Sequence, residues 1–500
     1  MSILEILIFF VIFIFFIINI FMEYNKNVNK VLPVLLVGLI GLNVMIDGYR
    51  WQMLPIYVLS VFVVAFILKS LFHKSLTKSR VKSKGRKIIG GITLLLLFSF
   101  SLIFPLLLPV KDLPSPSGPF SVGTSNFRLT DSSREEIFTL DEDDIREFLV
   151  SVWYPADIDK DDSLKTYWDE DGYVANAFGD NSGMGSFFFS HLSLVKTNSY
   201  IDASISKEQN SYPVIIYSHG FNGLNTDNTM LFESLASKGY IVFSINHTYE
   251  AVASLYPNGE FITSDFEYFS ENYLGNEEEF TSLMETFNAT EDIEIQKGIV
   301  QQIMSSDDQL RELVKIRTED VSFLLDEMVT MNQNNPILNS SIDLTRIGML
   351  GYSLGGATAT DMCILDSRIQ ACINMDGWPY GELFNADNTV DKPYLLIGSE
   401  RVDAFDEMVD TYMYEKLAND SYIVTIKGAE HPNFLDFPYL LNIFKYLGFW
   451  GPIDSLRLET ISEDLVSSFF DKYLKNEDLS IENIADKYEE ATYRGKALLE

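Results

Sequence analysis

Four apolar runs fill most of the first 110 residues of this 500-residue chain. They cover residues 3–21, 31–46, 53–71 and 88–110. Each is close to the roughly 20 residues that a helix needs to cross the hydrocarbon of a bilayer. Because lipid offers the backbone no hydrogen bonds, such runs cross a membrane only as helices or as closed barrels. We therefore predict an all-α transmembrane region over residues 1–110 with four helices.

Two of these runs admit another interpretation. The first resembles a cleaved signal peptide in length, but no basic residue precedes it, Glu5 lies inside it, and no small-residue cleavage pattern follows. The second is the shortest and is compatible with a re-entrant or interfacial segment. We favour four crossing helices.

The loops between the runs predict the orientation. Residues 69–87, between the third and fourth runs, contain eight Lys or Arg and no acid, and Lys26 and Lys30 lie in the first loop. Basic loops stay on the cytoplasmic side, where they face anionic lipid. We therefore expect a multi-pass protein of the cell membrane whose residues after Val110 lie on the extracellular side.

The remaining chain has a different composition. Residues 1–110 carry a charge balance of +8, and the rest carries −42. So acidic a surface disfavours nucleic acid as a partner. The two cysteines, Cys363 and Cys372, form neither a disulfide framework nor zinc-type spacing, and we expect buried free thiols.

Short β-branched runs alternate with helical patterns beyond a proline-rich linker over residues 111–120. The runs cover residues 148–155, 213–220, 240–247, 346–353, 371–378, 394–400 and 422–431. Near-continuous apolar strands separated by helices indicate a mostly parallel sheet with helices on both faces. We assign residues 121–480 to this α/β domain and 481–500 to an acidic, helical tail.

Two stretches interrupt the alternation. Residues 168–205 are irregular, and residues 256–335 form an insertion that is acidic and aromatic early and helical later. In the helical part, apolar residues recur at helical spacing and predict packing against the sheet. They are Leu310, Leu313, Val314, Val321, Leu324, Leu325 and Met328. The acidic and aromatic part is a lid over a site, a contact with lipid headgroups or a solvated surface insertion, and we favour the last.

The stretch RIGMLGYSLGGATATDM, residues 346–362, places Ser353 between glycines where a strand gives way to a helix. A serine at such a corner has its hydroxyl lifted above the sheet, as in the nucleophile turn of the α/β-hydrolase fold. The helix N-terminus that follows supplies N–H groups for a developing oxyanion. We therefore predict an α/β-hydrolase fold with Ser353 as nucleophile.

A serine nucleophile needs a base, and the chain has five histidines. His73 lies in the cytoplasmic loop and His191 in the irregular region. In this fold the acid and the histidine follow the serine, and His431 alone lies downstream of Ser353. We therefore predict His431 as the base.

The acid and the oxyanion donors come from strand ends. Asp376 follows the strand after the nucleophile helix, and Asp403 and Asp406 follow the next strand, so spacing alone leaves the acid open. The motif YSHGF places a donor N–H at Phe221, and Leu354 supplies the second. We expect His219 to brace this loop; His247 also ends a strand.

Several motifs in order resemble the plasma-type platelet-activating-factor acetylhydrolase family. They are FLVSVWYPA, YSHGF, INHTYEA, RIGMLGYSLGGAT, INMDGW, KPYLLIGSE and IKGAEHPNF. The resemblance runs from about residue 120 to 474 and implies Ser353 as nucleophile, Asp376 as acid and His431 as base. It also implies oxyanion donors at Phe221 and Leu354, no cofactor, and calcium-independent removal of short or oxidised acyl chains from phospholipids. The N-terminal region and residues 168–205 depart from the family pattern.

We therefore expect a membrane-bound serine esterase that acts on a lipid or small ester without a metal. Within enzymes, the alternatives are a general short-chain carboxylesterase or a cell-wall deacylase. Outside enzymes, the alternative is a catalytically silent membrane sensor on a hydrolase scaffold.

Overall fold

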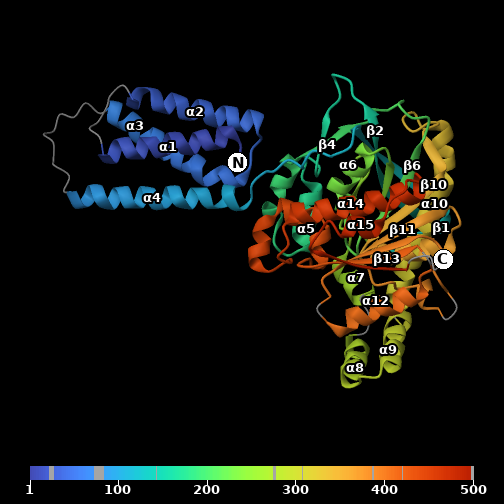
Figure 1. The fold of residues 1–500 in the computed structure, drawn as a ribbon. Helices are drawn as coiled ribbons and strands as arrows, with labels where there is room; N and C mark the ends of the chain where they lie inside the picture. Colours follow the sequence, from blue (N-terminus) through green and yellow to red (C-terminus); the bar gives the residue numbers. More distant parts are fainter. Residues whose placement is uncertain are drawn as a thin grey trace.

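A computed structural model gives the fold as a helical bundle beside an α/β domain (Figure 1). The bundle lies to one side, and its helix ends near the N-terminus face the α/β domain. The structure describes residues 1–21, 28–72, 84–141, 143–273, 277–306, 308–385, 388–401, 403–418 and 420–496. The basic stretch that predicts orientation lies largely outside these residues.

The bundle consists of the four helices that the apolar runs predict. They are α1 (Ile3–Phe21), α2 (Val28–Ile46), α3 (Leu54–Phe72) and α4 (Lys84–Leu107). Two stretches, Trp51–Lys69 and Gly90–Leu107, are long and apolar enough to cross a membrane by length and composition. The apolar stretches of α1 and α2 are shorter, so four crossings remain a prediction.

A buried ion pair closes the end of the bundle that faces the α/β domain. Arg50 donates to both carboxylate oxygens of Glu5 at 2.7 Å and to the carbonyl of Leu108 at 2.8 Å. Next to it, the indole of Trp51 donates to the carbonyl of Phe187 in the α/β domain. The buried ion pair of the bundle and the contact of Trp51 with the α/β domain therefore lie at the same end.

A twelve-stranded sheet forms the α/β domain, and its order is β14-β13-β12-β11-β10-β6-β7-β2-β1-β4-β3, with β5 paired to β2. The six strands from β13 to β7 run parallel. Their bounds are β6 (Tyr212–Ser218), β7 (Ile241–Asn246), β10 (Ile342–Tyr352), β11 (Ile369–Met375), β12 (Tyr394–Ser399) and β13 (Ser421–Ile426). The predicted mostly parallel sheet is confirmed.

Both faces of the sheet are covered, which explains the continuous apolar strands. On β6, Ile216 packs into one core and its neighbour Ile215 into the other. Helices α10 (Asp308–Asn334), α11 (Leu354–Leu365) and α12 (Ala404–Lys416) cover the first face. Helices α6 (Thr229–Ser237), α14 (Ser455–Leu474) and α15 (Ile481–Ala485) cover the second.

Of the antiparallel part of the sheet, the sequence predicts only the strand over residues 148–155. Strand β2 (Ile145–Asp157) pairs with β7 and with β1 (Ser121–Glu135), in which polar residues obscure the alternation. The stretch predicted to be irregular contains helix α5 (Tyr173–Asn181) and strands β4 (Lys196–Ile201) and β5 (Ser204–Ile205). Short strand β3 (Leu164–Thr166) precedes it. These elements extend the sheet beyond its parallel centre.

The insertion is helical, as its later part predicts. It contains β9 (Phe261–Thr263), α7 (Phe266–Tyr273), α8 (Glu277–Ala289), α9 (Ile293–Ser306) and α10, while β9 pairs with β8 (Ala253–Leu255). Six of the seven stripe residues on α10 are buried, the exception being Leu310. Figure 1 shows α8 and α9 projecting from the domain, whereas Phe269 of α7 packs with Phe221 and Leu354.

Two predictions are wrong. The tail after residue 480 is helical only over α15; β14 (Ala491–Lys496) then pairs antiparallel with β13, so the α/β domain extends past residue 480. Cys363 and Cys372 are buried as expected but form a disulfide, because the end of α11 packs on β11 with their Cα atoms 6.2 Å apart.

Candidate active site

Ser353 lies at the sharp corner between β10 and α11. Its φ of 55° is in the left-handed region, which side chains other than glycine rarely adopt. A Cβ at Gly351 would lie 1.8 Å from the carbonyl oxygen of Gly355, and one at Gly355 would lie 1.9 Å from that of Ser218. The flanking glycines are therefore required for the backbone to make this turn.

His431 begins the short helix His431–Phe434 that follows β13. Its Nε2 lies 2.9 Å from Ser353 Oγ, the distance of a hydrogen bond. The imidazole stacks on the ring of Tyr352 with centroids 4.9 Å apart, and the Tyr352 hydroxyl donates to the carbonyl of His431. The residue before the serine thus holds the histidine beside it.

Asp376 contacts the other side of the imidazole. Its Oδ2 lies 2.7 Å from His431 Nδ1, and its φ of 54° is also left-handed. Its Oδ1 accepts hydrogen bonds from the Ser399 N–H at 2.8 Å, the Ser399 hydroxyl at 3.0 Å and Arg401 at 2.9 Å. Burial raises the pKa of Asp376, but the hydrogen bond with His431 and the Arg401 guanidinium outweigh it and hold the pKa below its ordinary value.

The other two acids that spacing leaves open have different partners. Asp403 caps α12 by accepting from the Asp406 N–H at 2.9 Å. Asp406 accepts from the indole of Trp378 at 3.1 Å. The structure therefore brings Asp376, rather than Asp403 or Asp406, to His431.

Phe221 and Leu354 line the same pocket as Ser353. A Cβ at Gly220 would lie 3.2 Å from the Cβ of Ser353, so the YSHGF loop passes directly beside the serine. Within the described part of the chain, the N–H groups of Phe221 and Leu354 donate to no protein acceptor. Both are therefore free to bind an oxyanion.

A pocket of about 360 Å³ opens onto the serine. Its lining includes Ser353, His431 and Asp376 and both oxyanion candidates. The rest of the lining consists of the aromatic or apolar side chains of Trp378, Tyr380 and Leu310 and the polar residues Ser399, Arg401 and Asp406. This volume lies near the lower end of the range for small-molecule sites.

Sequence reasoning missed the support of the acid and the histidine. Ser399 ends β12 and Arg401 follows it in the motif GSERVDAF, the segment that also contains Asp403. Arg401 also pairs with Asp410 at 2.9 Å. Their position could have indicated this role, because residues that follow neighbouring parallel strands lie at the same edge of the sheet as Asp376.

The remaining histidines lie elsewhere. His191 is buried in the short helix Ser190–Leu194, within the electrostatic reach of Arg50. His219 lies within the YSHGF loop and is buried together with His247, whose N–H donates to it. His73 is outside the described residues.

These features define an α/β-hydrolase: a mostly parallel sheet, a serine at the strand–helix corner, and a histidine and acid in hydrogen-bonding order behind it. A solved structure, a ferulic acid esterase from Streptomyces cinnamoneus, matches with a TM-score of 0.60 at 22% identity. The match covers 77% of this chain and 99% of that one. At this identity the match shows the fold alone.

Residues 108–491 match the family model described as "Platelet-activating factor acetylhydrolase, isoform II". The chain belongs to this family and is a carboxylic ester hydrolase of the platelet-activating-factor acetylhydrolase type.

Curated relatives agree with this assignment. The platelet-activating factor acetylhydrolase of Cavia porcellus is 25% identical over 394 residues, covering 72% of this chain and 78% of that protein. The enzyme of the same name from Gallus gallus is 24% identical, covering 72% and 83%. A probable 1-alkyl-2-acetylglycerophosphocholine esterase of Arthroderma benhamiae is 23% identical, covering 66% and 77%.

Proposed function

We propose that this chain is a membrane-tethered serine esterase that removes short acyl chains from phospholipids through an acyl-enzyme. The observation that carries the proposal is the hydrogen-bonded series Ser353–His431–Asp376 in the lining of a pocket. A pocket of about 360 Å³ suits a short acyl chain better than a long one.

The first half of the reaction transfers the acyl group to the enzyme. Ser353 Oγ attacks the ester carbonyl while His431 Nε2 takes its proton. Asp376 holds the imidazole in the tautomer that has its proton on Nδ1 and stabilises the imidazolium that forms. The N–H groups of Phe221 and Leu354 stabilise the oxyanion, and His431 returns the proton to the departing lyso-lipid oxygen.

The second half regenerates the enzyme. His431 takes a proton from water as the water attacks the acyl carbonyl. The tetrahedral intermediate collapses, Ser353 recovers its proton from His431, and the short carboxylic acid leaves. The half-exposed imidazole, with 46% of its side-chain surface accessible, is within reach of that water.

Three features support an outward-facing domain beside lipid. Residues 111–120 lead directly from α4 into the domain, and the predicted topology places them outside. The disulfide between Cys363 and Cys372 fits an oxidising compartment. Tethering also keeps the pocket close to a lipid substrate, so we place the enzyme on the outer face of the cell membrane with four spans.

The test compares the purified chain with Ser353→Ala on an acyl-length series. Wild type is expected to hydrolyse p-nitrophenyl acetate and phosphatidylcholines with acetyl to hexanoyl groups at the middle position, and to leave hexadecanoyl groups. Ser353→Ala is expected to hydrolyse none of them while unfolding at the same temperature. Activity on soluble esters without activity on any phospholipid would favour a general short-chain carboxylesterase.

A further inference from the structure

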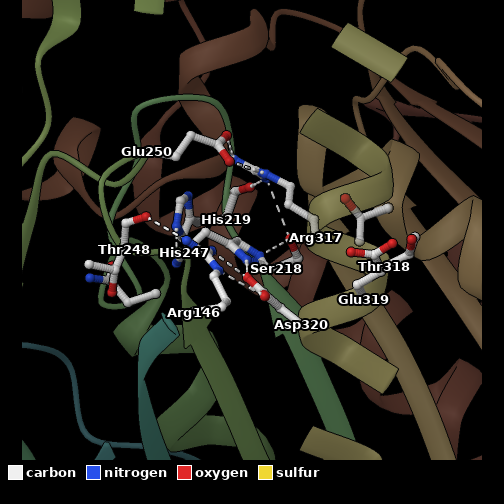
Figure 2. A network of polar contacts seen from close by, with 12 residues as sticks. Arg146, Ser218, His219, His247, Thr248, Glu250, Arg317, Thr318, Glu319 and Asp320 are labelled. Carbon is white, nitrogen blue, oxygen red and sulfur yellow. Dashed lines mark hydrogen bonds and ion pairs between the residues drawn. The ribbon is translucent and has the colours of Figure 1, made fainter. Parts of the chain in front are cut away.

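A buried network of charged groups lies behind the oxyanion loop, which we define as Ser218–Phe221 (Figure 2). Arg317 and Asp320 of α10 reach it from the insertion, and both are fully buried. They stand three residues apart and so share one face of the helix. A buried charge costs several kcal/mol unless partners compensate it, so the partners of these two residues are informative.

Arg317 bonds to the backbone of the oxyanion loop. Its Nη1 donates to the carbonyl of His219, and its Nη2 donates to the carbonyl of Gly220 at 3.2 Å. Glu250 accepts from Nε of the same guanidinium at 2.9 Å and from Nη2, which supplies the countercharge. The planar fork thus joins a carboxylate on one side to two loop carbonyls on the other.

His219 reinforces the same carbonyl. Its Nδ1 lies 2.6 Å from the Gly220 oxygen, and because a carbonyl only accepts, Nδ1 carries the hydrogen. Its Nε2 then accepts from the N–H of His247 at 3.2 Å. Burial, followed by the charge of Arg317, lowers the pKa of His219 well below its ordinary value, so the ring is neutral.

A second serine–histidine–aspartate series anchors the strand ends. Ser218 Oγ and Asp320 Oδ2 each lie 2.9 Å from a ring nitrogen of His247, and Asp320 also pairs with Arg146. All of these side chains are buried, so the series meets no substrate. Its effect is to fix β6, β7 and α10 to one another directly behind the loop.

These contacts also fix the direction of the oxyanion donor, because the peptide is planar. The Gly220 carbonyl and the Phe221 N–H belong to one planar trans peptide and point in opposite directions. Holding the carbonyl on the buried side therefore directs the N–H to the side where Phe221 lines the pocket. A cation on the carbonyl also polarises the peptide, which strengthens its N–H as a donor.

We propose that Arg317 is a positioning residue for the oxyanion hole, holding the Gly220–Phe221 peptide so that the Phe221 N–H meets the oxyanion. This inference rests on the proposed function, because it assigns Phe221 as a donor in that reaction. It gives the insertion a role in the chemistry: α10 adds a guanidinium to a carbonyl that His219 and the Gly223 N–H, at 3.1 Å, also hold.

The test uses Arg317→Lys in the detergent-solubilised full-length chain. Lysine keeps the charge but loses the fork that spans Glu250 and both carbonyls. We expect kcat on p-nitrophenyl acetate to fall about 10- to 100-fold, less than the roughly 10²–10³-fold cost of losing a donor outright. KM should change less than about twofold, because ground-state binding does not use the oxyanion contact.

The inhibition constant of a transition-state analogue distinguishes a positioning role of Arg317 from a purely structural one. An alkyl trifluoromethyl ketone adds to the serine as an oxyanion, so its inhibition constant should rise by the factor by which kcat/KM falls. Arg311→Lys is the matched control, since Arg311 lies on the same helix and bonds to the Ser305 carbonyl, away from the loop. It should leave both quantities unchanged.

A double variant keeps the test decisive if Arg317→Lys fails to fold. Arg317→Gln with Glu250→Gln removes both charges together and leaves neither one unpaired. It should lose kcat/KM and analogue affinity in parallel. Wild-type kinetics in the folded variant, or lost kcat with unchanged analogue affinity, would overturn the positioning role alone; a wild-type chain without esterase activity would instead overturn the proposed function.

Discussion

Ser353 and Asp376 both have left-handed backbone at the end of parallel strands, φ 55° and 54°. Such strain collects at functional positions, where the surrounding structure holds it in place. Glycine spacing and chain order predict Ser353 and His431 from sequence. Spacing could not separate Asp376 from Asp403, because both follow parallel strands; the 2.7 Å contact with His431 Nδ1 distinguishes Asp376 in the structure.

At this scale, Asp376→Asn should lower kcat on p-nitrophenyl acetate by about 10⁴-fold, because an amide favours the wrong tautomer of His431. Asp403→Asn is the matched control; asparagine also caps helices, so both activity and stability should be close to wild type. Near-normal turnover in Asp376→Asn together with a loss in Asp403→Asn would reverse the assignment.

At the scale of elements, long apolar strands and periodic helices were predictable and short or mixed ones were not. The six parallel strands of the large sheet pack into a core on each face, so their apolar composition alone predicts them. Strands β1 and β14 carry polar residues on pairing edges, and β14 pairs only after the chain has crossed α14 and α15. Its six residues have no signal that separates them from a tail.

The disulfide gives an element-scale prediction. Cys363→Ala with Cys372→Ala should lower the free energy of unfolding by about 2–3 kcal/mol, from the lost constraint on a short loop of the unfolded chain. Urea unfolding with and without reductant measures this, and titration of the denatured, unreduced chain should find no free thiol. Two free thiols in that titration would restore the original expectation.

The buried His191 gives a second prediction at this scale, on how stability depends on pH. Burial, followed by the charge of Arg50, lowers its pKa to about 4, against an ordinary value near 6.5. Between these values the unfolded chain binds a proton that the folded chain refuses, so stability is complete above about pH 6.5 and falls as the pH drops toward 4. The contribution of His191 at pH 4 is about 3 kcal/mol.

His191→Gln should therefore flatten the fall of the unfolding temperature between pH 6.5 and 4.5. The difference between the two proteins at pH 7.5 measures any change in packing and is subtracted. Burial also lowers the pKa values of His219 and His247, but their contribution to the pH dependence is the same in both proteins. Parallel curves for the variant and wild type would show that His191 does not titrate in this way.

At the scale of the whole molecule, composition predicts that the chain has two parts. It does not predict how the two parts contact each other. The shift from +8 to −42 at residue 110 predicts a bundle and an acidic domain in different surroundings. That Arg50 pairs with Glu5 beneath the domain, and that Trp51 meets Phe187, depends on side chains far apart in sequence. No local pattern encodes such a contact.

Sidedness is the prediction that belongs to this scale. A fluorophosphonate probe that cannot cross membranes should label the chain in intact cells as strongly as in lysed ones, because the predicted topology places Ser353 outside. Ser353→Ala in the same cells is the control. Labelling that requires lysis would place the domain in the cytoplasm and contradict the predicted orientation.

The central claim is that Ser353 is a nucleophile activated by His431, and mass-spectrometric mapping of a fluorophosphonate adduct tests it most directly. The predicted result is one adduct per chain on the peptide that contains Ser353, absent from Ser353→Ala and strongly slowed in His431→Gln. An adduct on another residue, or undiminished ester hydrolysis by Ser353→Ala, would contradict the account.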